Sequence, residues 1–156
     1  MYAADSSPFQ LDGRRALITG GGRGIGRACA LALASEGAAV MICGRRATKG
    51  NEIEREGRAA GHDLVFVQAD VSDEDDRAML VDKLRDQFGR LDVLVNNAVF
   101  ARRRLPNEKT SDYWRKSLDT NVIAVVVLTE LAVPLIVESG GGSVINISST
   151  AVYSKT

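Results

Sequence analysis

A run of glycines near the beginning of the chain has the composition of a phosphate-binding turn. Residues 20–26 read Gly-Gly-Gly-Arg-Gly-Ile-Gly. Glycine adopts positive φ without a steric cost and lets a backbone approach a pyrophosphate. The helix predicted after the turn adds unpaired N–H groups and a partial positive charge. A turn without a ligand needs fewer glycines, so we expect cofactor binding by Gly20, Gly22, Arg23, Gly24, Ile25 and Gly26.

The spacing of these glycines excludes two common phosphate-binding motifs. No frame through residues 20–26 gives G-x-G-x-x-G. A phosphate loop of the Walker type needs Gly-Lys-Ser/Thr, whereas Gly26 is followed by Arg27 and Ala28. The turn therefore belongs to a different class of nucleotide-binding sequence.

Two arginines follow the apolar run 39–43, which predicts the second strand of the sheet. The residues at the end of this strand usually decide whether a nicotinamide-binding protein prefers NAD or NADP. Proteins that prefer NAD tend to place an acidic residue there, which binds the ribose 2′-hydroxyl. This chain has Gly44, which leaves room, followed by Arg45 and Arg46, whose planar guanidinium groups suit a phosphate. Arg23 can reach the same region. We therefore predict NADP(H) in preference to NAD; the alternative is that Arg45 and Arg46 are only solvated loop charges.

Apolar runs and helical patterns alternate along the whole chain. Strands are predicted at 15–19, 39–43, 64–67, 91–95 and 143–147, and helices at 25–35, 48–60, 72–88 and 111–138. Ser72, with Asp75 three residues later, predicts a helix start of the capping-box type. This alternation is typical of a doubly wound α/β fold of the Rossmann type.

In that fold the parallel strands take the order 3-2-1-4-5, and the ligand crevice lies beside strands one and four, where the order reverses. We expect residues 11–156 to form one dinucleotide-binding domain after an N-terminal extension of residues 1–10. The later strands of a complete sheet of this kind are absent from the sequence.

Composition and charge narrow the class of protein. Hydrophobic residues make up 45% of the 156 residues, and 20 basic side chains balance 20 acidic ones. This balance argues against a nucleic-acid partner. Cys29 and Cys43 have no metal-ligand spacing and suggest reduced thiols in a cytoplasmic protein. The apolar run Val122–Val137 is shorter than the roughly 20 residues of a membrane span, so we expect a buried helix and no membrane partner.

Several motifs together resemble the short-chain dehydrogenase/reductase family. Residues 19–26 match its T-G-x-x-x-G-x-G sequence, and Asp70-Val71 follows the third strand. Asn96-Asn97-Ala98 resembles its N-N-A-G motif, with Val99 in place of the glycine. Asn121 lies in the long helix, and Ile147-Ser148-Ser149 ends the fifth strand. The resemblance covers the chain from Leu11 onwards.

The resemblance implies an NADP(H)-dependent oxidoreductase, similar to carbonyl reductases and 3-oxoacyl-acyl-carrier-protein reductases. Such a protein transfers a hydride between nicotinamide and a small carbonyl or alcohol substrate. Asp70 and Val71 would contact adenine, and Asn97, Ala98 and Ile147 would complete the cofactor site. Ser149 would hydrogen-bond the carbonyl oxygen, and Asn121 would help to order a water in a proton relay. The helix around Val122–Val137 would form part of a homo-oligomer interface.

The family's Tyr-x-x-x-Lys pair is missing before the chain ends at Thr156. Tyr153 lies only four residues after Ser149, and Lys155 follows Tyr153 by two residues, which places the two side chains on different sides of a helix. We therefore expect the 156-residue form to be inactive. An inactive nucleotide-binding module with a regulatory or scaffold role stays open, whereas Arg45 and Arg46 argue against another Rossmann enzyme such as a methyltransferase.

Overall fold

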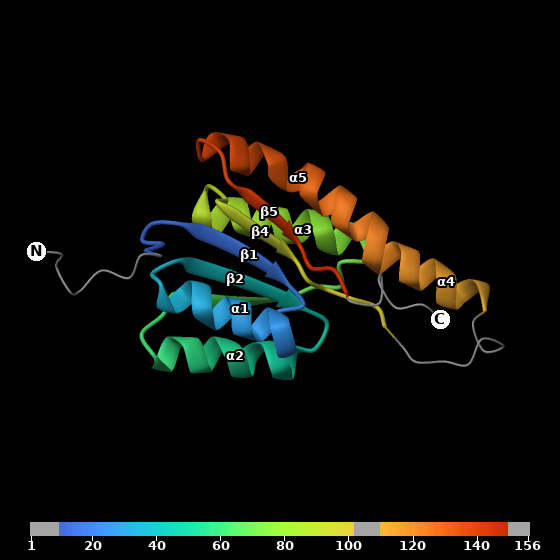
Figure 1. Cartoon of the computed structure of the whole chain (residues 1–156), viewed down its shortest axis with the longest axis horizontal. Helices are drawn as coiled ribbons and strands as arrows, with labels where there is room; N and C mark the ends of the chain where they lie inside the picture. The colour runs from blue at the N-terminus through green and yellow to red at the C-terminus, as the bar shows by residue number, and fades with distance from the viewer. Residues whose placement is uncertain (1–9, 102–109, 150–156) are drawn as a thin grey trace, which may run out of the picture.

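The computed structural model describes residues 10–101 and 110–149, which form a five-stranded sheet with helices on both faces (Figure 1). The strands are β1 (Arg15–Thr19), β2 (Ala39–Gly44), β3 (Leu64–Gln68), β4 (Val93–Asn96) and β5 (Ser143–Asn146). The helices are α1 (Gly24–Ser35), α2 (Ala47–Ala59), α3 (Glu74–Phe88), α4 (Ser111–Leu118), a π-helical segment (Asp119–Ile123) and α5 (Ala124–Glu138).

All neighbouring strands are parallel, and their order is β3-β2-β1-β4-β5. The predicted fold class and strand order are therefore confirmed. Because the order reverses between β1 and β4, the loops that follow these two strands leave the sheet in different directions and open a crevice between them.

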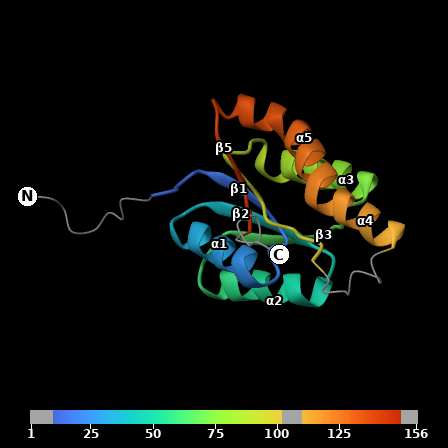
Figure 2. The same cartoon turned by 45° about the vertical axis from the view of Figure 1, so that its right-hand side comes forward.

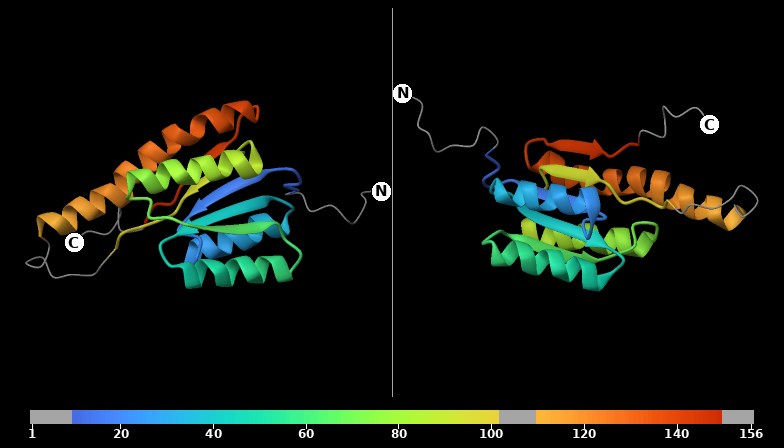
Figure 3. Two further views of the ribbon diagram at one scale, coloured as in Figure 1. Left: turned by 180° about the vertical axis from the view of Figure 1, so that it is seen from behind. Right: turned by 60° about the horizontal axis from the view of Figure 1, so that its bottom comes forward.

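Two separate hydrophobic cores cover the two faces of the sheet. On one face, α1 and α2 pack against the sheet; on the other, α3 and α5 lie side by side, as the view from behind shows (Figure 3). Leu17 of β1 joins the α3/α5 core, and its neighbour Ile18 joins the α1/α2 core. The strands are thus apolar on both faces, which explains why they appear in the sequence as unbroken apolar runs.

A glycine allows α2 to lie directly on the sheet. A Cβ added at Gly50 would lie 2.1 Å from the ring of Phe66, which belongs to β3. This close approach fixes the rotation of α2 over β3 and so decides which side chains of its first turn face the strand ends.

The predicted start of α3 is wrong by one residue. Asp73, not Ser72, is the N-cap, and its carboxylate accepts a hydrogen bond from the Asp76 N–H at 3.0 Å. The Ser72 hydroxyl instead donates to Asp70 at 2.7 Å. Both residue types can cap a helix, and the competing acceptor at Asp70 decides between them.

The long helical stretch Ser111–Glu138 is more exposed than expected. By length and composition alone it could cross a membrane, since it has 28 residues and its most apolar 18 have a mean hydropathy of 2.2. A core helix of a soluble protein passes the same test, and only 22% of this apolar stretch is buried. α5 packs Ala124, Leu128, Ala132 and Leu135 against the sheet and turns Val126, Val133 and Val137 outwards. The expectation of a buried helix therefore holds for one face only.

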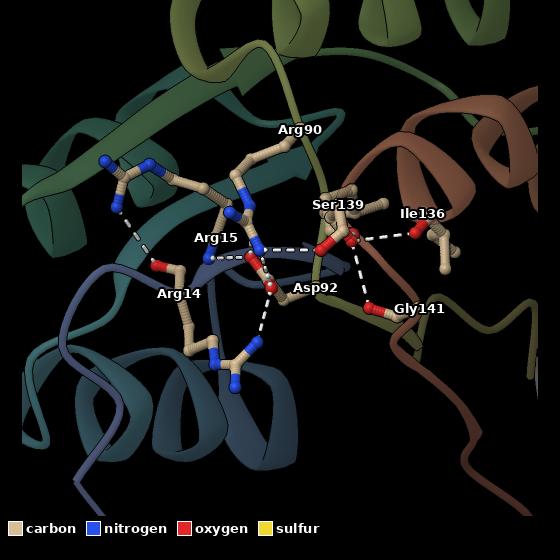
Figure 4. A network of polar contacts seen from close by, with 8 residues as sticks. Arg14, Arg15, Arg90, Asp92, Ile136, Ser139 and Gly141 are labelled. Carbon is tan, nitrogen blue, oxygen red and sulfur yellow. Dashed lines mark hydrogen bonds and ion pairs between the residues drawn. The ribbon is translucent and has the colours of Figure 1, made fainter.

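A carboxylate network ties the amino ends of β1 and β4 to the end of α5 (Figure 4). Asp92, only 3% exposed, accepts hydrogen bonds from Arg14 Nη1 (2.9 Å), the Arg15 N–H (2.9 Å) and Arg90 Nη2 (2.7 Å). Arg90 also donates to the Ser139 carbonyl at 3.1 Å. Burial would raise the pKa of Asp92, but the hydrogen bonds from Arg90, Arg14 and the Arg15 N–H outweigh it and lower the pKa.

Candidate nucleotide-binding site

The glycine turn joins β1 to α1 at the carboxyl edge of the sheet, as predicted. Gly20 and Gly24 have φ values of +68° and +54°, a region that other residues rarely adopt. The Gly21 N–H donates to the Cys43 carbonyl of β2 at 3.1 Å. Arg23 precedes the helix in an extended conformation, with no side chain capping the helix N-terminus. The first N–H groups of α1 thus lie directly behind the turn.

Gly26 has a packing role instead of a place on the cavity wall. A Cβ at this position would lie 2.5 Å from both Asn97 Nδ2 and the Gly20 carbonyl oxygen. A Cβ at Gly20 would lie 3.0 Å from the Ala98 Cα. The turn therefore folds tightly onto itself and onto the segment after β4, and both glycines make that contact possible.

Thr19 links the loops after β1 and β4, a role that sequence analysis did not assign to it. Its buried hydroxyl oxygen accepts hydrogen bonds from the N–H groups of Asn97 (3.0 Å) and Ala98 (2.9 Å). Asn97 Nδ2 in turn donates to the Thr19 carbonyl at 2.9 Å. A threonine at a strand end directly before a glycine turn is the signal that could have revealed this link.

A cavity of about 780 Å³ opens between these loops at the carboxyl ends of the strands. Figure 2 shows the edge of the sheet at which β1, β2, β3 and β4 end. Eleven of the thirteen predicted cofactor residues line the cavity: Gly20, Gly22, Arg23, Gly24, Ile25, Arg45, Arg46, Asp70, Val71, Asn97 and Ala98. Gly26 and Ile147 do not line it.

The cavity wall carries an excess of positive charge. Among the described residues, Arg23, Arg45, Arg46 and Lys49 line it together with one carboxylate, Asp70, which gives these five side chains a formal charge of +3 (four minus one). Sequence analysis missed Lys49, which lies in the first turn of α2. Its ammonium donates to Glu52 at 2.8 Å, and this hydrogen bond lowers the pKa of Glu52.

Space remains beside these cations. A Cβ at Gly44 would meet no atom within 4 Å. Arg45 Nη1 lies 3.8 Å from Asp70 Oδ2, and the Arg45 side chain is 61% exposed, so this ion pair is weak and can be exchanged for a stronger anion. The arrangement suits a ligand with several negative charges.

Cys43 lies at the base of the cavity and is chemically inert. Its side chain is fully buried, and burial raises the pKa of the thiol to about 12. The thiolate is the nucleophilic form of cysteine. Cys43 therefore contributes shape to the cavity and no covalent chemistry.

This difference predicts the alkylation pattern. We expect iodoacetamide at pH 8 to modify the half-buried Cys29 of the native protein and to leave Cys43 intact, as measured by peptide mass spectrometry. Addition of urea should make both residues reactive. Equal rates for the two cysteines in the native protein would contradict the assignment.

Asn121 lies in the π-helical segment and holds the chain that follows β4. Its Oδ1 accepts from the Phe100 N–H at 2.8 Å, and its Nδ2 donates to the Phe100 carbonyl at 3.1 Å and to Ser117 Oγ at 3.2 Å. The neighbouring Thr120 lines the cavity, whereas Asn121 does not. Single π-turns inside α-helices often accompany functional sites, and nothing in the helical pattern of the sequence predicts this one.

The segment that carries Ser149 is held beside β4 by a buried amide. Asn96 Nδ2 donates to Asn146 Oδ1 at 2.9 Å and to Thr129 Oγ1 of α5 at 3.2 Å, and the Ile147 N–H donates to the Asn96 carbonyl at 3.0 Å. Ser149 follows this pair at the carboxyl edge, exposed and outside the cavity wall. Tyr153 and Lys155 lie outside the described residues.

A protein-family model described as short chain dehydrogenase matches residues 14–155. An uncharacterized oxidoreductase from Mycobacterium tuberculosis is 43% identical over 91% of this chain and 54% of its own length. A 3-oxoacyl-(acyl-carrier-protein) reductase from Staphylococcus aureus is 38% identical over 87% of this chain and 56% of its own length. The chain thus spans little more than half the length of these curated relatives.

A solved structure has the same fold. The crystal structure of a metagenomic short-chain oxidoreductase in complex with NADP has a TM-score of 0.88 and 34% identity, over 94% of this chain and 67% of its own. The family match covers the glycine turn, the cavity wall and the strand before Ser149 alike. The chain therefore belongs to the short chain dehydrogenase family.

Proposed function

We propose that this chain is the nucleotide-binding part of an NADP(H)-dependent oxidoreductase that acts on a small carbonyl or alcohol substrate. One observation carries the choice of cofactor: four cations line the cavity around Gly44, where a Cβ would meet open space. NADP differs from NAD by a 2′-phosphate, and guanidinium groups bind phosphate in a bidentate manner. The relative crystallised with NADP supports the same choice.

The cavity wall offers a partner for each part of such a cofactor. The backbone from Gly20 to Gly24 and the N-terminus of α1 would hold the pyrophosphate. Arg45 and Arg46 would hold the 2′-phosphate, with Arg23 and Lys49 close by. The adenine would lie against Asp70 and Val71. The other end of the cofactor would extend along Asn97 and Ala98 towards Ile147, at the edge of the sheet where Ser149 lies.

The bound nicotinamide would donate or accept the hydride. Ser149 would hydrogen-bond the substrate oxygen and so stabilise the charge that develops on it. Asn121 holds the Phe100 backbone, so its contribution to a water relay would depend on that anchored position. The sequence contains no Tyr-x-x-x-Lys pair, so the group that would exchange the proton with that oxygen is not among these residues.

Cellular location and assembly complete the proposal. The outward side chains of α5 and of the preceding helical segments, among them Trp114, Val122 and Val126, form an apolar surface suited to a second copy of the protein. We propose a cytoplasmic homo-oligomer with no nucleic-acid or membrane partner.

Removal of one guanidinium tests the choice of cofactor. We expect Arg45→Ala to weaken NADPH binding about tenfold or more, because a hydrogen bond to a charged group contributes about 1.5–3 kcal/mol. NADH lacks the 2′-phosphate and should bind almost unchanged. Calorimetric titration measures both affinities. Arg55→Ala, in the exposed part of α2, is the matched control and should change neither; an equal loss of NADPH and NADH affinity would refute the proposal.

Turnover separates the enzyme from its alternative, an inactive nucleotide-binding module. We expect the 156-residue chain to bind NADPH but to reduce no carbonyl at a measurable rate, since general acid catalysis alone contributes about 10²–10⁴ in rate. In a longer chain that carries Tyr-x-x-x-Lys, Ser149→Ala should reduce turnover sharply and leave NADPH binding intact, whereas Ser148→Ala should affect turnover less. Robust turnover by the 156-residue chain would show that the catalytic assignment is wrong.

A further inference from the structure

Arg77 is a buried cation in the hydrophobic face of α3. It is 6% exposed and shares that face with Leu80, Val81 and Leu84. Its Nε is buried without a hydrogen-bond partner, and no carboxylate oxygen in the described part of the chain lies within 4.0 Å of its guanidinium. A buried, unpaired cation destabilises a fold, so its presence at a core position calls for a compensating role.

In the part of the chain that the structure describes, Arg77 makes one side-chain hydrogen bond, and this bond leads to the cavity. Its Nη1 donates to the Val71 carbonyl at 2.7 Å. Other hydrogen bonds join residues within the loop between β3 and α3. The Asp73 N–H donates to the Asp70 carbonyl at 2.8 Å, and the Ser72 N–H donates to Asp70 Oδ1 at 3.1 Å. Two side chains of α3 reach into the loop: Asp76 Oδ2 accepts from the Asp70 N–H at 2.7 Å, and Arg77 holds the Val71 carbonyl, the only backbone carbonyl of the loop that a side chain of α3 holds in the described residues. Asp70 and Val71 both line the cavity.

We infer that Arg77 is a positioning residue for the adenine end of the cavity, an inference that rests on the proposed function. By holding the Val71 carbonyl inside the core, it fixes the peptide plane that follows Val71. The Asp73 N–H holds the Asp70 carbonyl of the preceding plane, so the Val71 N–H is oriented between two fixed planes. The Val71 N–H has no hydrogen-bond partner within residues 10–101 and 110–149. Together with the Asp70 carboxylate it offers one donor and one acceptor, which match N1 and the N6 amino group of adenine.

A purely structural role predicts a different outcome for a substitution. Methionine has a similar length and no charge, and replacing a buried charged group by a well-packed apolar one is often neutral or stabilising. Arg77→Met should therefore leave the midpoint of urea unfolding unchanged or raised. Nucleotide affinity should fall at the same time, because the Val71 peptide is no longer held. Stability and binding should thus move in opposite directions.

The test compares NADPH with its 1,N6-etheno analogue, in which N1 and N6 of adenine are bridged. We expect Arg77→Met to weaken NADPH binding by up to about tenfold, as loss of the neutral hydrogen bond from the Val71 N–H to adenine would, and to weaken binding of the analogue far less. Arg77→Lys, which keeps a donor for the Val71 carbonyl, should recover most of the NADPH affinity. Arg85→Met, at the exposed end of the same helix, should change neither affinity.

The outcomes are distinguishable. Absence of NADPH binding by the unsubstituted protein would defeat the proposed function itself. If that protein binds and Arg77→Met loses nothing, or loses equally on both ligands, Arg77 has no positioning role. Failure of Arg77→Met to fold would likewise overturn the inference, because it would make Arg77 a structural residue.

Discussion

Gly26→Val is expected to abolish NADPH binding in a protein that still folds. The new Cβ would lie 2.5 Å from Asn97 Nδ2 and from the Gly20 carbonyl oxygen, and the backbone oxygen cannot move away without displacing the whole turn. Overpacking of this kind typically costs about 1–3 kcal/mol of stability, which a stable domain tolerates. The affinity should fall about 100-fold or more, because the N–H groups of the turn no longer converge on the pyrophosphate.

The physical reason differs from the one that the sequence alone offers. A side chain at Gly26 would not enter the cavity; it would push apart the two loops that Thr19 and Asn97 hold together. Calorimetry measures the affinity, and circular dichroism checks the fold. Ala28→Val adds a similar bulk to an exposed position of α1 and should bind as the unsubstituted protein does. Wild-type affinity in a folded Gly26→Val protein would mean that the turn does not hold the nucleotide.

The sheet could be predicted because its central strands, β1, β2 and β4, are buried on both faces. Such strands stand out as unbroken apolar runs, and the rule for parallel βαβ units then fixes their order. The first and last residues of each strand are predicted less accurately from the sequence, since they depend on contacts between distant segments. β4 begins at Val93, two residues later than expected, because the Leu91 N–H donates to the carbonyl of Leu135 in α5 and Asp92 serves the arginine network.

The predicted cofactor residues were brought together for a related reason. Most of them lie in the loops after β1, β2, β3 and β4 or in the first turn of α1, and parallel strands gather these segments at one edge. Lys49 and Arg77 were missed because they belong to helices. The direction of a helical side chain depends on how the helix is rotated over the sheet, which for α2 is fixed by the contact between Gly50 and Phe66. Local sequence patterns carry no such information.

The network around Asp92 is far from the cavity, and we expect it to make a large, pH-dependent contribution to stability. One buried carboxylate accepts from two arginine side chains and one backbone N–H, and it thereby joins the start of β1, the start of β4 and the end of α5. Asparagine at this position offers one oxygen in place of two and no charge. The guanidinium groups of Arg14 and Arg90 would lose their counter-ion.

Asp92→Asn is therefore expected to lower the free energy of unfolding at pH 7 by about 3 kcal/mol, the lower end of the usual range for a broken buried pair, because Arg14 and Arg90 stay partly in water. Since the pKa of Asp92 is lowered on folding, its stabilisation is fully present above its unfolded pKa of about 3.9 and is lost as the pH falls through the folded pKa. Urea unfolding at pH 7, 5 and 3 should show a constant difference between the two proteins at pH 7 and 5 and a smaller one at pH 3.

Asp82→Asn removes a highly exposed partner of Arg85 and should cost less than about 1 kcal/mol at every pH. A difference for Asp92→Asn that does not depend on pH would show that the loss comes from packing and not from the charge.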